Sequence, residues 1–304
     1  MAHAQTASTF ANQSQNIFSQ PLCIFGVPVD RETIFADSRG IYQKRVEKRQ
    51  RRMIVKTTFI KFFLHQGERL RCLTTGYTPV SIIEQLLTGA ASLFFKRVFI
   101  VFTDQRILVV PSRFNHSAPS AISQICYADC AAIQMSGRAL VVQYKNGQRE
   151  KFPYVGRKEK KKIRSLIQFL PSSPKESGRL QARTWLCPSC TSELDEGARL
   201  CGKCKLQFKS NQQAKIRALM IPGGGYFYSR FPVPGVVVGL IESGLAAWLV
   251  YQCMALRNGL PVRLGLLPLL GTLLIAEKWI VAFHSQRLIG NQIPEERDFA
   301  LRKL

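Results

Sequence analysis

The chain has 304 residues, room for about one to three domains. Its 43 Lys and Arg against 19 Asp and Glu give a net charge of +24, which favours an anionic partner, either lipid head groups or nucleic acid. Nine cysteines at this length exclude a small disulfide-stapled scaffold. The N-terminal segment has no basic start and no apolar stretch, so we expect no cleaved signal peptide, and reduced thiols then place residues 1–210 in the cytosol.

The first 53 residues form a segment of their own in this interpretation. Residues 1–20 are rich in Ala, Ser, Thr, Gln and Asn without an apolar period, which predicts disorder. Residues 21–40 show no sustained pattern and are expected to be loop. Residues 41–52 combine many basic side chains with one acid and predict a short helix. That helix is either a surface for lipid or nucleic acid or an ordinary solvated face, and the sequence leaves both open.

From residue 54 the pattern is that of a compact β-rich domain. Runs of β-branched and aromatic residues at 97–103 and 106–112 predict two strands joined by a tight turn. The Asn-Gly pair at 146–147 predicts a second hairpin, because both residues tolerate the positive φ that a type I′ turn requires. Residues 80–95 are apolar and fit either a helix or a loop.

An amphipathic helix closes this domain before Pro171. One face of the helix carries Ile163, Leu166, Ile167 and Leu170. A run of strands followed by one helix is the order of a pleckstrin-homology-like (PH-like) β-barrel with a capping helix.

Two short motifs add a resemblance to this order. Gly67-Glu68 and the tetrapeptide at 103–106, Thr-Asp-Gln-Arg, resemble the opening and the hairpin of bacterial PH-like (GRAM-like) domains. The resemblance covers about residues 55–170, and it implies a scaffold that binds lipid, peptide or protein. Turn chemistry predicts that Asp104 and Arg106 stabilise the hairpin rather than contact a ligand.

The most specific chemistry lies in two Cys-x-x-Cys pairs separated by ten residues. Each pair can form a knuckle, and two facing knuckles supply a tetrahedral set of four thiolates, which suits structural Zn²⁺. The four predicted zinc ligands are Cys187, Cys190, Cys201 and Cys204. The stretch resembles the small zinc-ribbon modules of bacterial proteins, although Lys205 stands where a glycine often follows the last cysteine. A redox-active thiol pair is the alternative.

The C-terminal part contains two apolar stretches, 233–253 and 264–283, each close to the length that a bilayer core requires. Their short connection predicts an antiparallel transmembrane hairpin; two buried core helices are the alternative. Basic residues flank both outer ends and are fewer in the connection, so both termini are expected on the cytoplasmic side of the inner membrane.

Glu242 lies in the middle of the first apolar stretch, where an ionisable side chain requires a partner. In an antiparallel hairpin Lys278 comes within reach of it, which predicts a Glu242–Lys278 contact with Glu277 directed toward a partner or the head groups. A protonated Glu242 without a pairing role is the alternative.

The fold class expected is therefore multi-domain: a PH-like β-barrel with a capping helix, a small treble-cysteine-knuckle zinc ribbon, and an α-helical transmembrane hairpin. The expected parts are a disordered or basic segment (1–53), the PH-like domain (54–170), a linker (171–184), the zinc ribbon (185–208), an interfacial segment (209–232), two spans (233–253 and 264–283) and a cytoplasmic tail (284–304).

These parts favour a membrane-anchored cytoplasmic adaptor or scaffold over an enzyme, because no nucleophile–base pair or carboxylate dyad follows from the spacing. Its expected partners are the membrane, crossed by two spans, and a protein, with anionic lipid as a further candidate and nucleic acid disfavoured. Two other classes stay open: a nucleic-acid-binding or regulatory membrane protein, and a small membrane subunit of a transport complex.

Overall fold

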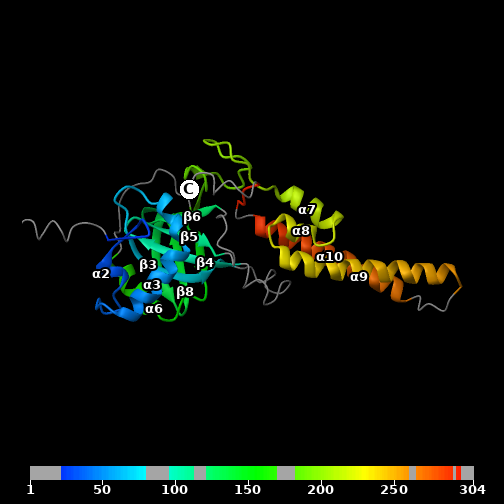
Figure 1. Cartoon of the computed structure of the whole chain (residues 1–304), viewed down its shortest axis with the longest axis horizontal. Helices are drawn as coiled ribbons and strands as arrows, with labels where there is room; N and C mark the ends of the chain where they lie inside the picture. The colour runs from blue at the N-terminus through cyan, green and yellow to red at the C-terminus, as the bar shows by residue number, and fades with distance from the viewer. Residues whose placement is uncertain are drawn as a thin grey trace, which may run out of the picture. The chain divides into compact units, whose positions relative to one another are not determined.

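The computed structural model describes residues 22–79, 96–112, 121–169, 182–259, 265–289 and 292–295. The described chain divides into two compact units, one holding most of the β-structure and one holding the cysteine pairs and the long helices (Figure 1). The stretches expected to be disordered (1–20) or apolar (80–95), and most of the linker at 171–184, lie outside the described residues.

The first unit contains a mixed sheet and a separate antiparallel sheet. In the mixed sheet β3 to β6 are antiparallel neighbours, and β2 runs parallel to β3. Its strands are β1 (Leu22–Ile24), β2 (Val27–Val29), β3 (Leu70–Tyr77), β4 (Arg97–Thr103), β5 (Arg106–Pro111) and β6 (Ile122–Cys126). The antiparallel sheet consists of β7 (Cys130–Ser136), β8 (Ala139–Tyr144) and β9 (Arg149–Phe152).

Both predicted hairpins are present. β4 and β5 pair across the turn at 104–105, and β8 and β9 pair across the Asn-Gly turn, where Gly147 has a φ of +85°. The closing helix is α6 (Lys160–Gln168), which buries Ile163 and Leu166. These two side chains complete an apolar core to which both sheets contribute, including Phe102, Tyr144 and Phe152. The described strands do not show a closed barrel.

The segment that precedes β3 is part of the same unit. It forms α2 (Arg31–Ile34), α3 (Lys44–Lys56) and a 3₁₀ turn at Thr58–Phe62. The buried Gln50 of α3 donates a hydrogen bond to the Leu73 carbonyl (3.0 Å) and accepts one from the Leu73 N–H (3.1 Å). It thereby satisfies both backbone groups of one residue of β3. The boundary placed at residue 53 by the sequence falls inside α3.

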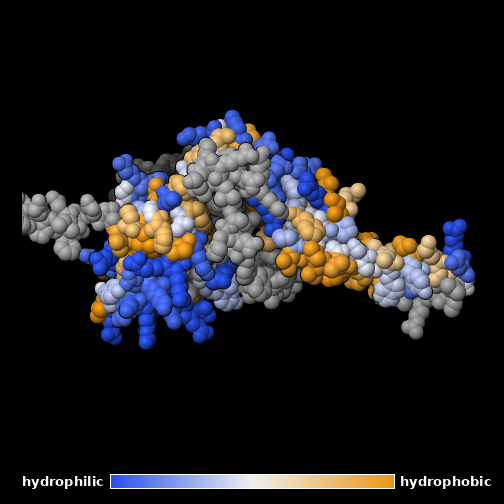
Figure 2. Space-filling model, viewed as in Figure 1, coloured by the Kyte–Doolittle hydropathy of each residue, from blue (hydrophilic) through white to orange (hydrophobic). Residues whose placement is uncertain are grey.

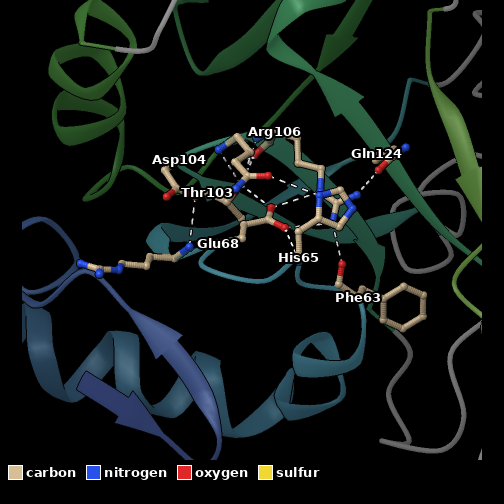
Figure 3. Close-up of polar contacts among 9 residues, drawn as sticks. Phe63, His65, Glu68, Thr103, Asp104, Arg106 and Gln124 are labelled. Atoms are coloured by element: carbon tan, nitrogen blue, oxygen red, sulfur yellow. Dashed lines mark hydrogen bonds and ion pairs between the residues drawn. The ribbon is translucent and has the colours of Figure 1, made fainter. Parts of the chain in front are cut away.

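A buried ion pair joins the two motifs that carry the PH-like resemblance (Figure 3). Arg106 Nε donates to Glu68 Oε1 at 3.1 Å, and Arg106 Nη2 donates both to Glu68 Oε2 at 2.9 Å and to the Phe63 carbonyl at 2.5 Å. Thr103 Oγ1 donates to the same carboxylate at 2.7 Å. Burial raises the pKa of Glu68, but the hydrogen bonds from Arg106, His65 and Thr103 outweigh burial and hold that pKa below its usual value.

Through this network the turn at 103–106 is bonded to residues 63–69, which precede β3, as well as within itself. Asp104 Oδ1 accepts from the Arg69 N–H at 3.0 Å, which fixes the start of β3 beside the turn. Arg106 itself is buried rather than exposed at the turn. The predicted structural role of both residues agrees with these contacts, and Glu68 is the partner that turn chemistry alone did not identify.

We predict that Arg106→Leu lowers the free energy of unfolding by about 3–5 kcal/mol, because it leaves the Glu68 charge buried without a partner. The double variant Glu68→Leu/Arg106→Leu should recover part of this loss. Since the folded pKa of Glu68 is depressed, its contribution to stability is present above the usual carboxyl range and is lost as pH falls through the folded pKa. Urea unfolding of the full chain in detergent, at several pH values, measures both effects.

The exposed pair Glu47–Arg51 provides the control, because a surface i, i+4 pair contributes only about 0.3–0.5 kcal/mol. If Arg51→Leu and Arg106→Leu destabilise the chain equally, the buried network does not support the domain.

The second unit contains a short hairpin and four helices. β11 (Glu193–Leu194) pairs with Trp185 and Leu186 of β10 (Thr184–Leu186). The helices are α7 (Asn211–Met220), α8 (Gly224–Tyr228), α9 (Pro232–Arg257) and α10 (Leu266–Ile289). α9 and α10 run side by side as a long pair, and α7 and α8 pack against α10 (Figure 1). α9 and α10 are both long and apolar enough to cross a membrane. α9 contains the whole predicted stretch 233–253, and α10 contains the predicted stretch 264–283 except for its first two residues.

Candidate metal centre

The two Cys-x-x-Cys pairs adopt the same backbone turn. In the first, the Thr191 N–H donates to the Cys187 carbonyl at 2.9 Å; in the second, the Lys205 N–H donates to the Cys201 carbonyl at 3.0 Å. Thr191 and Lys205 both have positive φ, 59° and 60°. Lys205 therefore occupies the left-handed position that a glycine often fills in such knuckles, and Thr191 does the same in the other one.

The two turns bring the four thiols together. The sulfurs of Cys187, Cys190, Cys201 and Cys204 all lie within 4.8 Å of one another. Two of the distances join the pairs: 3.5 Å from Cys187 to Cys204 and 3.6 Å from Cys190 to Cys201. Tetrahedral zinc with bonds of about 2.3 Å separates its sulfur ligands by about 3.8 Å. The cluster thus has the size of a four-sulfur metal site.

The surroundings of Cys201 favour a thiolate. Burial raises the pKa of this thiol, but hydrogen bonds from the backbone N–H groups of Cys204 and Lys203 and from the Ser192 hydroxyl lower it to about 6. Burial raises the pKa of Cys187 and of Cys204, so of these three thiols Cys201 ionises first, and a thiolate is the form that binds a metal. With four sulfurs filling a tetrahedron no coordination position remains open, so the arrangement suits a structural rather than a catalytic ion.

The cysteines are also the centre of a small apolar core. Buried Leu194, Leu206 and Phe208 pack around Cys187 and Cys201, with Trp185 against them. This core is too small to hold its loops by burial alone, a situation in which a metal commonly supplies the missing stability.

The module is tied to the segment that follows α10. The Lys209 N–H donates to the Ile293 carbonyl at 2.9 Å, and the Glu295 N–H donates to the Gln207 carbonyl at 3.0 Å. Gln292 Nε2 donates to the Asp195 carbonyl at 2.9 Å. The sequence did not indicate this docking, because residues 292–295 have no motif and belonged to the expected tail.

The predicted contact between α9 and α10 is confirmed. Lys278 Nζ lies 2.6 Å from Glu242 Oε2, and the Glu242 side chain is 1% exposed. Glu277 Oε2 is buried and has no hydrogen-bond partner among the described residues, and the direction of Glu277 toward a partner or the head groups stays a prediction.

The comparisons with known proteins give no relatives. No family model matches the chain, and neither a curated protein nor a solved structure matches it.

We predict that the purified full chain contains about one zinc ion per chain and that Cys201→Ser abolishes this stoichiometry, because three sulfurs and a hydroxyl bind the ion far more weakly. Elemental analysis after extensive dialysis measures the metal. The matched control is Cys23→Ser, which removes an exposed thiol of β1 and should retain the ion. Absence of any stoichiometric metal from the wild-type chain contradicts the assignment.

Proposed function

We propose that this chain is a membrane-anchored cytoplasmic adaptor, held in the inner membrane by α9 and α10, with a structural zinc ribbon and a basic PH-like domain. The observation that carries the proposal is the exposure of apolar side chains along α9 and α10. Only 11% and 22% of their most apolar windows are buried.

Those side chains cover the surface of the helix pair. Leu240 is 70% exposed, Val233 72% and Leu269 62%. Figure 2 shows patches of hydrophobic residues on these helices, with residues of intermediate hydropathy between them. Core helices of a globular protein bury such side chains, whereas a continuous apolar surface marks contact with lipid or a partner. At about 1.5 Å per residue, the 26 residues of α9 also exceed the roughly 30 Å of a bilayer core.

The basic residues that flank the pair support an orientation with both termini in the cytoplasm. Lys209, Lys215, Arg217 and Arg230 precede α9, whereas only Arg257 and Arg263 lie at the connection. Reduced cysteines in the metal module agree with the same side.

The first unit supports the PH-like part of the proposal through its order of elements. Four antiparallel strands, β3 to β6, precede a three-stranded sheet and a single closing helix, and one apolar core spans both sheets. Domains of this architecture present surfaces for lipid or protein, so the ligand must be inferred from the surface chemistry.

One surface of the first unit is strongly basic. The Arg49–Glu159 ion pair connects α3 to the residue that precedes α6. The exposed cations of α3 and of residues 157–164, which lead into and include the first turns of α6, form what we call the basic α3/α6 surface: Lys44, Arg45, Lys48, Arg51, Arg52, Lys56, Arg157, Lys158, Lys161 and Arg164. Figure 2 shows the corresponding hydrophilic area.

The acids on these helices are already engaged: Glu47 binds Arg51, and the buried Glu159 binds Arg49. The surface therefore has a large uncompensated positive charge. In a protein anchored in a membrane, anionic head groups are the closest polyanion, and each Lys or Arg near such a surface contributes about 1 kcal/mol.

If α9 crosses the membrane, a charge on its exposed face should weaken membrane integration. Leu240→Lys should reduce the membrane-integrated fraction, since a lysine at the centre of a span costs about 2.5–3.5 kcal/mol. The measurement is the fraction that resists alkaline extraction from membranes. Phe169→Lys, which replaces a 76% exposed side chain of the first unit, is the control and should behave as wild type.

If α9 instead faces water, Leu240→Lys should leave the fractionation unchanged or increase the yield in the aqueous phase. That result would remove the membrane anchor from the proposal.

The basic surface predicts binding to anionic lipid. Full-length chain in phosphatidylcholine nanodiscs should co-sediment with vesicles that contain phosphatidylglycerol, and not with pure phosphatidylcholine vesicles. Lys48→Glu/Arg52→Glu should weaken this binding at least about tenfold. The control is Lys145→Glu/Arg149→Glu, the same change in net charge on the exposed β8–β9 hairpin.

Salt should weaken the binding as well, because exposed charges carry it. Equal effects of the two double variants would show that net charge, and not the basic α3/α6 surface, is responsible. Binding of duplex DNA or RNA without binding of anionic vesicles would replace the lipid by nucleic acid as partner.

A further inference from the structure

The end of α7 exposes a group of large apolar side chains. Met220, its last residue, is 78% exposed, and Ile216 and the following Ile221 are 52% and 51% exposed. Ala214 and Ala218, which follow the helical period on the opposite face, are fully buried. Exposed apolar side chains that form a group, rather than lying singly, mark contact with lipid or with a partner.

α7 runs along α10 from its end toward its middle. Near the start of α7, Ala214 packs with Ile289, the last residue of α10. One turn later, Ala218 packs with Val281 and Ala282. Figure 1 shows α7 and α8 beside the part of the helix pair that contains the start of α9 and the end of α10. The apolar end of α7 therefore points into the helix pair and not away from it.

After a turn at 221–223 the chain returns along α9. A Cβ on Gly239 would lie 3.2 Å from the Pro222 carbonyl oxygen, and a Cβ on Gly235 would lie 3.0 Å from the Phe227 ring. Since Gly235 is closer than Gly239 to the start of α9, the turn lies deeper along α9 than α8 does. We call residues 211–228 the α7–α8 hairpin and residues 219–223 its tip.

The tip lies at a level within both apolar stretches. The Gly223 N–H donates to Glu242 Oε2 at 3.0 Å, and Lys278 Nζ donates to the Ile221 carbonyl at 3.4 Å. In the predicted spans 233–253 and 264–283, Glu242 and Lys278 are nine and five residues from the outer ends, or about 8–14 Å at 1.5 Å per residue. The turn is thus placed inside the predicted spans rather than beyond their ends.

The backbone of this turn has its hydrogen-bonding partners within the protein. Pro222 has no N–H, the Gly223 N–H is bonded to Glu242, and the Gly224 N–H donates to the Ile221 carbonyl at 2.9 Å. Non-helical backbone at membrane depth is tolerated only where such groups are satisfied in this way.

Lys278 satisfies the end of α7. The last carbonyl groups of a helix have no partner within that helix. Lys278 Nζ donates to the Ala218 carbonyl at 3.1 Å and to the Ile221 carbonyl, in addition to its contact with Glu242. The ion pair between α9 and α10 therefore holds the tip as well as the two long helices.

We propose that the α7–α8 hairpin is a re-entrant element: its tip enters the hydrocarbon of the bilayer and contacts acyl chains through Ile216, Met220 and Ile221. The proposal rests on the proposed membrane anchor. The tip packs against Gly235 and Gly239, whose neighbours in sequence on α9 include exposed apolar side chains, so the acyl chains that cover α9 also cover the tip.

The cations of α7 mark the level of the head groups. The Lys215 ammonium lies over the Trp279 ring, 5.4 Å from its centroid, and the Arg217 guanidinium lies over the Tyr228 ring at 4.5 Å. Aromatic rings and long basic side chains are typical of the membrane interface, where the charged ends reach water. Met220 lies about 8 Å beyond Lys215 along the helix, which is below that level.

The test is photolabelling of the full chain in nanodiscs with phosphatidylcholine that carries a diazirine in the middle of one acyl chain. Trypsin separates the start of α7 (210–215), the tip with α8 (218–230) and α9 (231–257). Mass spectrometry should find lipid adducts on residues 219–221 and on α9, and few on 210–215, the control within the same helix.

The outcomes separate the hairpin from the anchor. Adducts on α9, with no more on 218–230 than on 210–215, overturn the re-entrant hairpin and leave the anchor in place. Absence of adducts from all three peptides removes both. Modification of 219–221 by a water-soluble diazirine instead of the lipid overturns the hairpin, because the tip then faces water and is free for a protein partner.

A pair of variants tests the same contact by stability. Met220→Asp should lower the Tm in nanodiscs by several degrees, since a carboxylate in contact with acyl chains is unfavourable. Phe169→Asp is the matched control: Phe169 is 76% exposed and also lies at the C-terminal end of a helix, so the charge meets the same helix dipole. Equal changes in Tm for the two variants contradict the proposal.

Discussion

The uncovered apolar surface of α9 and α10 is the constraint on which the rest of this chain depends. Such a surface is unfavourable in water in proportion to its area, and lipid removes that cost. Lipid also imposes a second condition, since any polar group within the helices must find its partner inside the protein. The Glu242–Lys278 pair meets that condition and fixes the α7–α8 turn on the two helices through Gly223 and two carbonyl groups.

The metal module is bonded to the same unit as the helix pair. Its core is small, and two knuckles with matching hydrogen bonds position four sulfurs that a metal can hold together. Backbone hydrogen bonds from residues 207–209 to residues 293–295 connect the module to the chain that follows α10. The metal module is therefore attached to the chain on both sides of the helix pair.

The features that depend on residues close together in the sequence were predictable. The Asn-Gly turn, the amphipathic α6 and the cysteine spacing each depend on neighbouring residues, so the sequence indicated them directly. The Glu242–Lys278 contact could also be predicted, because a short connection between two antiparallel helices fixes which residues lie opposite each other. The direction of the neighbouring Glu277 side chain depends on its rotamer and stays a prediction.

Contacts between distant residues were not predictable in the same way. Gln50 pairs with Leu73, and Glu68 with Arg106, across 23 and 38 residues of sequence. Neither pair follows a helical or strand period, and the highly charged composition of α3 suggested a separate segment. The docking of residues 292–295 on the metal module combines backbone hydrogen bonds with one from the Gln292 side chain, and no sequence motif marks these contacts.

The measurement that tests the membrane-anchored organisation most directly is the accessibility of two positions to an impermeant maleimide in intact cells. One is Cys23 in β1 and the other is Asn258 at the end of α9, both exposed, in a chain with Asn258→Cys and Cys253→Ser. The account predicts labelling at position 258 in intact cells and labelling at Cys23 only after permeabilisation. Equal labelling of both positions in intact cells, or labelling of neither until permeabilisation, would contradict it.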